Sequence, residues 1–175
     1  MRGVVMKIAI IGYSGSGKST LAKQLSTYYK IPVLFLDKVK FLPNWVDRGL
    51  DESRLIVQDF MKNDSWVIDG NYRDFLQRQR LEEATKIIFL DFPRYSCLYR
   101  AFKRYRKYKN KTREDMANGC VEKMDFEFVN WILREGRTKE IKSHYDEIKK
   151  EFADKIVILR NQKEIDLFVL NIVNS

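Results

Sequence analysis

The sequence predicts an α/β fold, a three-layer sandwich with helices on both faces of a five-stranded parallel sheet. Short apolar runs rich in β-branched residues alternate with stretches of helical periodicity, as expected of parallel strands joined by right-handed crossovers. The first apolar run leads directly into a glycine-rich loop, and a helical pattern follows that loop. A length of 175 residues fits a single domain, residues 1–175, with its own core.

The N-terminal third of the chain predicts two strands and one helix. Residues 5–11 are mostly apolar and β-branched and predict a buried strand. After the glycines, apolar residues at helical spacing predict a helix that ends before Pro32. Residues 33–36 predict a second, short strand that closes on Asp37. We expect a loop over residues 38–49, which contain a proline, an asparagine and a glycine.

The middle of the chain continues the alternation of predicted helices and strands. An amphipathic helix is predicted around residues 55–61, and a third strand over residues 66–69. A short helix over residues 75–83 leads to a fourth apolar strand over residues 87–91, which Pro93 ends.

A lid-like insert is expected after the fourth strand, over about residues 108–137. A basic helix over residues 95–108 leads into it, and the first part of the insert is polar and irregular. Apolar residues at helical spacing then predict one long helix over residues 126–150. A fifth strand over residues 155–159 and a closing helix over residues 165–172 complete the domain.

The positive charge of the chain is concentrated in one segment. The net charge is +9, and residues 94–113 contain nine Lys and Arg residues and no Asp or Glu. Such a segment suits a polyanion, either nucleic acid, including DNA, or the phosphates of a nucleotide. The alternative is a solvated helix face with no partner.

The composition also limits where in the cell the protein is expected and which metal sites it could form. No apolar run approaches about 18 residues, so we expect no membrane span, and the short N-terminal apolar run predicts a core strand rather than a secretory signal. Cys97, Cys120 and His144 are too few soft ligands for a structural zinc site. Two unpaired thiols are typical of a cytoplasmic protein.

Residues 12–19 match the phosphate-binding pattern G-x-x-x-x-G-K-[ST], in the strand–loop–helix setting that the pattern requires. Its glycines let the backbone curl around a phosphate, so that successive N–H groups point inward beside the N-terminus of the next helix. We therefore expect ATP to be bound by Gly12, Tyr13, Ser14, Gly15, Ser16, Gly17, Lys18, Ser19 and Thr20.

Two side chains of this loop have separate expected roles. Lys18 brings a positive charge to the β and γ phosphates, and Ser19 offers its hydroxyl to Mg²⁺, with help from Thr20. Once a triphosphate is held, the expected reaction is phosphoryl transfer, which depends mostly on positioning and charge neutralisation.

Three predicted strands end in aspartate, at Asp37, Asp69 and Asp91. Ligands of open parallel sheets bind beyond the carboxyl ends of the strands, so we expect all three on the edge that carries the phosphate loop. Asp69 and Asp91 are candidates for Mg²⁺, and Asp37 is a candidate to bind or deprotonate an acceptor hydroxyl. The alternative for each is a helix cap or a turn residue.

Arginines are the other candidates for catalysis, because a guanidinium binds two phosphoryl oxygens at once. Arg100 and Arg104 lie one helical turn apart near the start of the insert, and Arg134 and Arg137 lie on the long helix beyond the insert's polar part. Each is expected to offset charge on the transferred group, or else to form a surface ion pair.

Residues of three other loops complete the set of candidates. Arg73 follows the third strand and is a candidate to grip the acceptor. Arg160, with Asn161, follows the last strand and is expected to border the adenine. Trp45 lies beside Asp37 and is a candidate stacking platform, although core or interface packing is the more ordinary role of a tryptophan.

These motifs resemble the adenylate-kinase-like branch of P-loop proteins, and more narrowly the bacterial DNA topology modulation proteins, also called FlaR-like proteins. The resemblance covers nearly the whole chain. It is carried by I-A-I-I-G-Y-S-G-S-G-K-S-T-L-A at residues 8–22, L-D-K-V at 36–39, L-P-N-W at 42–45, W-V-I-D-G-N-Y at 66–72, I-I-F-L-D-F-P-R at 87–94, W-I-L-R-E-G-R at 131–137 and L-R-N-Q-K-E-I at 159–165.

The resemblance implies the fold of P-loop containing nucleoside triphosphate hydrolases, with the sheet order 2-3-1-4-5 and a helical lid. In that order Asp69 and Asp91 flank the phosphate loop. Adenylate kinases carry D-G-F-P-R after the third strand, whereas this chain has D-G-N-Y-R at residues 69–73, so AMP is not the expected acceptor. The segment around Asp37 is more similar to small-molecule kinases such as gluconate or shikimate kinase.

Two classes of function remain open from the sequence. The first is a kinase that moves the γ phosphate of ATP to an unidentified small acceptor, such as a nucleoside or nucleotide. The second is an ATP-binding regulator that acts on DNA through residues 94–113, as a monomer or homodimer. Simple ATP hydrolysis is a third option, but no glutamate or glutamine stands out to orient water.

Overall fold

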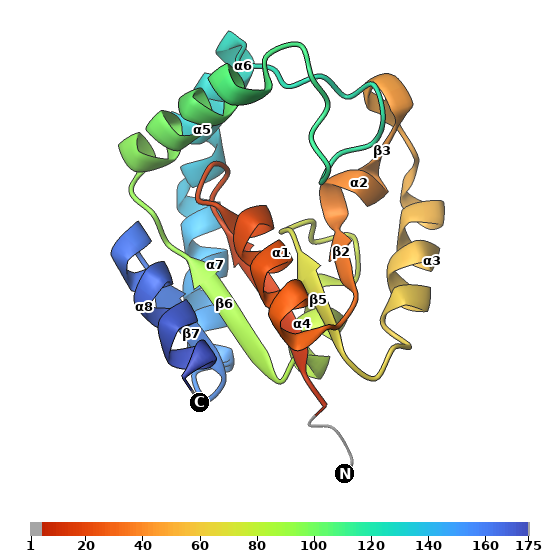
Figure 1. The fold of residues 1–175 in the computed structure, drawn as a ribbon, viewed down its shortest axis with the longest axis vertical. Coiled ribbons are helices and arrows are strands. Elements are labelled where there is room, and N and C mark those ends of the chain that lie inside the picture. Colours follow the sequence, from red (N-terminus) through yellow and green to blue (C-terminus); the bar gives the residue numbers. More distant parts are fainter. Residues whose placement is uncertain (1–4, 175) are drawn as a thin grey trace.

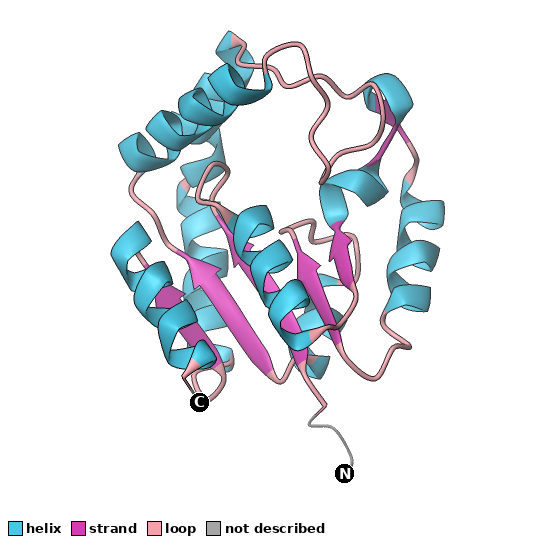
Figure 2. Ribbon diagram, viewed as in Figure 1, coloured by secondary structure: helices cyan, strands magenta, loops and turns pink. Residues whose placement is uncertain are grey.

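The computed structural model describes residues 5–174 and contains a five-stranded parallel sheet with helices on both faces (Figures 1 and 2). The sheet has the order β2-β5-β1-β6-β7 and all its pairs are parallel. Its strands are β1 (Lys7–Gly12), β2 (Val33–Phe35), β5 (Trp66–Asp69), β6 (Lys86–Leu90) and β7 (Ile156–Leu159). Strands β3 (Phe41–Leu42) and β4 (Val46–Asp47) form a separate antiparallel hairpin, so the order counted within the large sheet alone is 2-3-1-4-5.

The central strand forms where the sequence is most apolar. Residues 8–12 of β1 are buried, because a parallel sheet with helices on both faces leaves its central strand no contact with water. Helix α1 (Lys18–Tyr29) packs Leu21, Ala22 and Leu25 onto the sheet and ends at Lys30, which has the left-handed conformation. Figure 1 shows α1 and α8 (Gln162–Val173) on the near face of the sheet, with α7 (Lys139–Glu151) on the far face.

The expected loop over residues 38–49 was wrong. The chain instead forms α2 (Leu36–Lys40), the β3–β4 hairpin and a 3₁₀ turn, η1 (Pro43–Trp45), before α3 (Leu50–Phe60). Asn44 and Trp45 both have positive φ, and residues far along the chain hold them in that conformation. Such long-range contacts leave no periodic pattern in the sequence. Helices α4 (Gln77–Glu83) and α5 (Arg94–Tyr108) lie near their expected positions.

The single long helix expected over residues 126–150 was also wrong. The structure has α6 (Phe126–Leu133), a 3₁₀ turn, η2 (Glu135–Arg137), and then α7 (Lys139–Glu151). Arg134 leaves the helical conformation, with φ −132° and ψ −68°. The Thr138 side chain then accepts a hydrogen bond from the backbone N–H of Ile141 and caps the new helix. Residues 134–140 contain no apolar side chain and include Gly136, so the sequence does mark this break and the prediction of a single helix overlooked it.

Residues 109–125, called the lid segment below, are irregular and arch from α5 across to the hairpin (Figure 1). Their buried Met116, Ala117 and Cys120 pack against Phe41 and Trp45 of the hairpin region. The backbone N–H of Trp45 also donates to Cys120 Sγ at 3.3 Å. This small apolar cluster, called the clasp below, joins two segments that are about 75 residues apart in the chain.

The helices of the described chain do not include a membrane span. Within residues 5–174 every helix is too short or too polar to cross a bilayer.

Candidate active site

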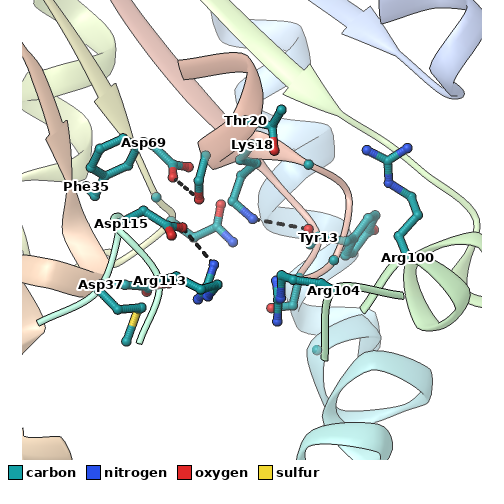
Figure 3. Close-up of a pocket in the computed structure, with 18 of the residues that line it drawn as sticks. Tyr13, Lys18, Thr20, Phe35, Asp37, Asp69, Arg100, Arg104, Arg113 and Asp115 are labelled. Carbon is teal, nitrogen blue, oxygen red and sulfur yellow. Dashed lines mark hydrogen bonds and ion pairs between the residues drawn. The ribbon is translucent and has the colours of Figure 1, made fainter. Parts of the chain in front are cut away.

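One large cavity lies beyond the carboxyl ends of the central strands, below the lid segment. Its volume is about 2120 Å³, above the roughly 300–1,000 Å³ of a typical single-ligand site. Figure 3 shows Lys18 in its middle, with Asp37, Asp69 and Asp115 on one side and Arg100 and Arg104 on the other. A cavity of this size has room for two ligands side by side.

The glycine-rich loop forms one wall of the cavity. Tyr13, Ser14, Gly15, Gly17, Lys18, Ser19 and Thr20 line it. Gly15 and Gly17 have positive φ, and a Cβ on Gly15 would lie 2.5 Å from the backbone oxygen of Cys97. The Lys18 ammonium folds back over the loop and donates to the carbonyl oxygens of Gly12 (3.0 Å) and Tyr13 (3.1 Å). The loop therefore has the curled backbone that the motif predicts, with its cation at the centre.

Gly12 and Ser16 support this loop from behind rather than lining the cavity. A Cβ on Gly12 would lie 2.5 Å from the backbone oxygen of Leu90, so only glycine allows β1 to turn this close to β6. Ser16 is fully buried, and within the described chain its hydroxyl has no hydrogen-bond partner.

A carboxylate and a hydroxyl meet directly beside the loop. Ser19 Oγ donates to Asp69 Oδ2 at 2.7 Å, while Asp69 Oδ1 is buried and has no hydrogen-bond partner among residues 5–174. Burial raises the pKa of Asp69 to about 6, against the opposing effect of the Lys18 charge. Mg²⁺ prefers oxygen ligands of this kind. The unpartnered oxygen and the neighbouring hydroxyl fit such an ion, held directly or through water.

The other two strand-end aspartates are separated by the fold. Asp37 lies in the first turn of α2, lines the cavity and accepts a hydrogen bond from the Tyr72 hydroxyl at 2.7 Å. Asp91 follows β6 and is absent from the described residues that line the cavity. The charge of Asp91 instead acts on Tyr13, whose pKa is raised mainly by burial. The structure thus brings Asp37 and Asp69 to one site and leaves Asp91 outside it.

Three of the predicted arginines line the cavity: Arg73, Arg100 and Arg104. Arg100 lies against Gly17 and over the Phe92 ring, 5.1 Å from its centroid, and donates to Gln162 Oε1 at 2.6 Å. Burial lowers the pKa of Arg100. Arg104 Nε donates to Glu122 Oε1 of the lid segment at 2.6 Å.

Three other predicted arginines lie elsewhere in the described structure. The Arg137 guanidinium packs on the Tyr13 ring, 3.7 Å from its centroid, and donates to the Phe92 carbonyl at 2.8 Å. It therefore supports the phosphate loop from outside the cavity. Arg134 is exposed at the break between α6 and α7. Arg160 is exposed after β7, where its backbone N–H donates to Glu164 at 2.8 Å.

Asn71 joins the phosphate loop to the end of β5, a role that sequence reasoning missed. Its side-chain oxygen accepts from the Gly12 N–H at 3.0 Å, and its side-chain nitrogen donates to the Gly12 carbonyl at 2.8 Å. Gln77 donates to the Asn71 carbonyl at 2.6 Å, and His144 Nε2 lies 2.7 Å from Gln77 Oε1. The available signal was the position of Asn71, two residues after a strand-end aspartate.

Arg80 was missed as well, and it fixes the same loop from below. It is fully buried, and its guanidinium donates to the carbonyls of Phe75 (2.8 Å), Tyr72 (2.9 Å) and Gly70 (3.2 Å). Burial lowers the pKa of Arg80 to about 9. The loop that presents Asn71, Tyr72 and Arg73 to the cavity is therefore held by one buried cation. No spacing in the sequence marks this arginine.

A third missed group lies in the lid segment. Arg113 donates to Asp115 at 2.7 Å, and its Nε lies 2.7 Å from Glu122 Oε2 as an ion pair without hydrogen-bond alignment. Glu122 is buried and also accepts from Arg104, so one carboxylate joins α5 to the lid segment.

Comparison with known proteins supports the fold of a P-loop kinase. No protein-family model and no curated protein sequence matches the chain. Among solved structures, shikimate kinase from Acinetobacter baumannii in complex with shikimate has a TM-score of 0.60 and 14% identity, covering 98% of this chain and 94% of that one. An uncharacterised protein from Eubacterium ventriosum has a TM-score of 0.52 and 15% identity, covering 98% and 99%. The narrower resemblance to DNA topology modulation proteins stays a prediction from the sequence.

Proposed function

We propose that the protein is a kinase that transfers the γ phosphate of ATP, with Mg²⁺, to a hydroxyl of a small nucleoside- or nucleotide-like acceptor. One observation carries this proposal. The Ser19–Asp69 pair and the Lys18 ammonium open into the same cavity as the Asp37 carboxylate. A cation-rich phosphate cradle that faces a carboxylate across one cavity is the arrangement that phosphoryl transfer to a hydroxyl needs.

The donor side is supplied by the phosphate loop. Its backbone N–H groups and the N-terminus of α1 bind phosphate oxygens, and Lys18 exchanges the carbonyls of Gly12 and Tyr13 for the β and γ phosphates. Ser19 and Asp69 would hold Mg²⁺, which supplies charge neutralisation between the β and γ phosphates when bound. Arg100 and Arg104 line the opposite wall and are proposed to meet the negative charge of the transferred group.

The acceptor side is supplied by α2 and the loop after β5. Asp37 is oriented by the Tyr72 hydroxyl and is proposed to receive the proton of the attacking acceptor hydroxyl. A bond forms between that oxygen and the γ phosphorus, while the bond from the γ phosphorus to the β–γ bridging oxygen breaks and leaves ADP. The proton then passes from Asp37 to solvent.

The proposal is tested by transfer of label from γ-labelled ATP in the presence of Mg²⁺ and a panel of small hydroxyl compounds. Lys18→Ala is the control for the loop, and Asp37→Asn is the control for the acceptor side. We expect Lys18→Ala to lose nucleotide binding, and Asp37→Asn to keep it while transfer falls at least 100-fold. Equal transfer by the wild type and Lys18→Ala across the panel would contradict the proposal.

A second candidate function, binding of nucleic acid, is favoured by the outer face of α5. Tyr95 and Tyr99 are 74% and 62% exposed there, next to exposed Arg106, and exposed Lys103 lies nearby at the rim of the cavity. Exposed aromatic rings between cations suit stacked bases and backbone phosphates. Binding of DNA that weakens steeply with salt and depends on Lys103 and Arg106 would support it, and absence of binding at low salt would reject it.

A further inference from the structure

The cavity wall opposite α5 is called the acceptor side below. It carries more carboxylate groups than cationic side chains that are free of an ion pair. It consists of Phe35, Asp37, Phe41, Trp45, Tyr72 and Asp115. Two of these residues, Asp37 and Asp115, are acidic, and Figure 3 shows both on the same side of Lys18 as Asp69.

The arginines next to this wall are already engaged by carboxylates. Within the described structure, Arg113 pairs with Asp115 and Glu122, and Arg73 pairs with Glu140 at 3.2 Å. Glu122 is buried, so an arginine that left it for a ligand phosphate would leave a buried carboxylate with less compensation. Lys123 is an exposed ammonium here, and it extends over the Trp45 ring, 5.3 Å from its centroid.

The same wall offers flat apolar surface. Phe35, Phe41, Trp45 and Tyr72 line the cavity, and each of these residues is only partly buried. Phe41 and Trp45 meet edge to face, with ring centroids 5.1 Å apart, and Met116 of the clasp packs beside them. Planar rings stack on such surfaces without needing charge.

We propose that the acceptor is an uncharged nucleoside, whose base packs on the aromatic wall and whose sugar hydroxyl meets Asp37. This inference rests on the proposed kinase function and narrows its acceptor class. A nucleoside monophosphate would bring two negative charges toward Asp37 and Asp115, while Arg113 and Arg73 beside this wall are already paired with carboxylates.

Matched pairs of probes test the inference: adenosine and AMP, guanosine and GMP, cytidine and CMP, uridine and UMP, and thymidine and TMP. Transfer from γ-labelled ATP is measured for each, after magnesium-dependent ATP binding has been measured by calorimetry. We expect at least one nucleoside to react with a kcat/KM at least tenfold above that of its monophosphate. Equilibrium dialysis with ADP and Mg²⁺ gives the same comparison for binding.

A charge variant makes the test specific to the wall. Asp115→Asn frees Arg113 from one partner, so we expect the nucleoside-to-monophosphate ratio to fall at least fivefold. Asp64→Asn removes the same charge from an exposed position outside the cavity and is expected to leave the ratio unchanged.

The possible failures can be told apart. A preference for the monophosphates, or ATP binding without binding of any nucleoside in the panel, would overturn the inference and leave the proposed kinase standing. Absence of magnesium-dependent ATP binding would overturn both.

Discussion

At the scale of single residues, the site depends on buried polar groups whose partners come from distant parts of the chain. Asp69 has one oxygen on Ser19 and the other without a partner in the described structure. Arg80 gives three donors to three carbonyls of one loop. The Asp69 carboxylate is therefore left with an oxygen that can bind a ligand, whereas the Arg80 guanidinium already donates to three carbonyls of the protein. We expect substitutions of these two residues to have different effects.

We expect Asp69→Asn to stabilise the nucleotide-free protein at neutral pH. Folding raises the pKa of Asp69 from 3.8 to about 6, so the folded state binds the proton more tightly than the unfolded state. Stability from this group is therefore complete below pH 3.8 and is lost as the pH rises through 6. The free energy of unfolding lost in this way is about 3 kcal/mol.

The measurement is urea unfolding of both proteins between pH 4 and pH 7. The stability of the variant relative to the wild type is expected to increase with pH, and magnesium-dependent ATP binding is expected to disappear in the variant. A constant difference across this range would show that Asp69 does not titrate in it.

Arg80→Met is expected to destabilise the protein strongly. It leaves three buried carbonyls without their donor, which should lower the free energy of unfolding by about 3–5 kcal/mol. Arg78 on the same helix is a matched control, because its ion pairs to Glu82 and Glu151 are exposed. Arg78→Met should leave the urea midpoint nearly unchanged, because exposed ion pairs contribute little to stability. Similar urea midpoints for the two variants would contradict the role assigned to Arg80.

At the scale of elements, the phosphate loop works because it packs directly on α5. The Gly15 backbone lies against the Cys97 carbonyl, and Gly17 lies against the Arg100 side chain. One helix thus positions the loop and also carries Arg100 and Arg104 toward the cavity. The loop and α5 are expected to move as one unit.

Gly15→Ala tests this contact. The new Cβ would lie 2.5 Å from the Cys97 carbonyl oxygen, so the loop must shift away from α5 and the ATP-induced rise in Tm should be lost. Gly49 is a control for backbone strain alone, because it also has positive φ and a Cβ there would meet no atom of the described structure within 4 Å. Gly49→Ala should cost roughly 1 kcal/mol and keep the ATP response. Retention of that response by Gly15→Ala would contradict the expectation.

The elements that could be predicted are those that local sequence determines. β1, the loop and α1 are encoded within residues 7–29, where apolar character, glycines and helical spacing follow one another. The β3–β4 hairpin depends instead on residues 116–120. The break at Arg134 is different, because the polar run of residues 134–140 and the Thr138 cap mark it locally and the prediction of one long helix overlooked them. At the site, the motif predicted Lys18 and Ser19. Arg80 and Glu122 act through distant backbone or charge and carry no local signal, and Asn71 is marked only by its position two residues after Asp69.

At the scale of the whole molecule, the clasp closes a ring of chain around the cavity. The lid segment starts at α5, crosses the opening and ends its crossing on the hairpin that follows β2 (Figure 1). Lys38 adds a hydrogen bond to the Glu114 carbonyl at 3.0 Å, and Lys23 of α1 pairs with the Glu114 side chain. The contact area is small, so we expect the lid segment to open locally without unfolding of the sheet.

Trp45→Ala is expected to increase hydrogen exchange of residues 110–125 at least tenfold, because it removes the largest side chain of the clasp. The strands of the large sheet should keep their protection. Val46→Ala is the control, because Val46 is 54% exposed and outside the clasp. Equal exchange in the two variants would show that the clasp does not hold the lid segment.

For the proposed kinase, this ring has an effect on turnover. ADP and the phosphorylated acceptor would lie beneath the lid segment, so we expect their release to become faster when Met116 and Cys120 separate from Phe41 and Trp45. The steady-state turnover rate would then depend on how often the lid segment opens. A viscous medium such as sucrose would therefore slow steady-state catalysis more than the first chemical turnover.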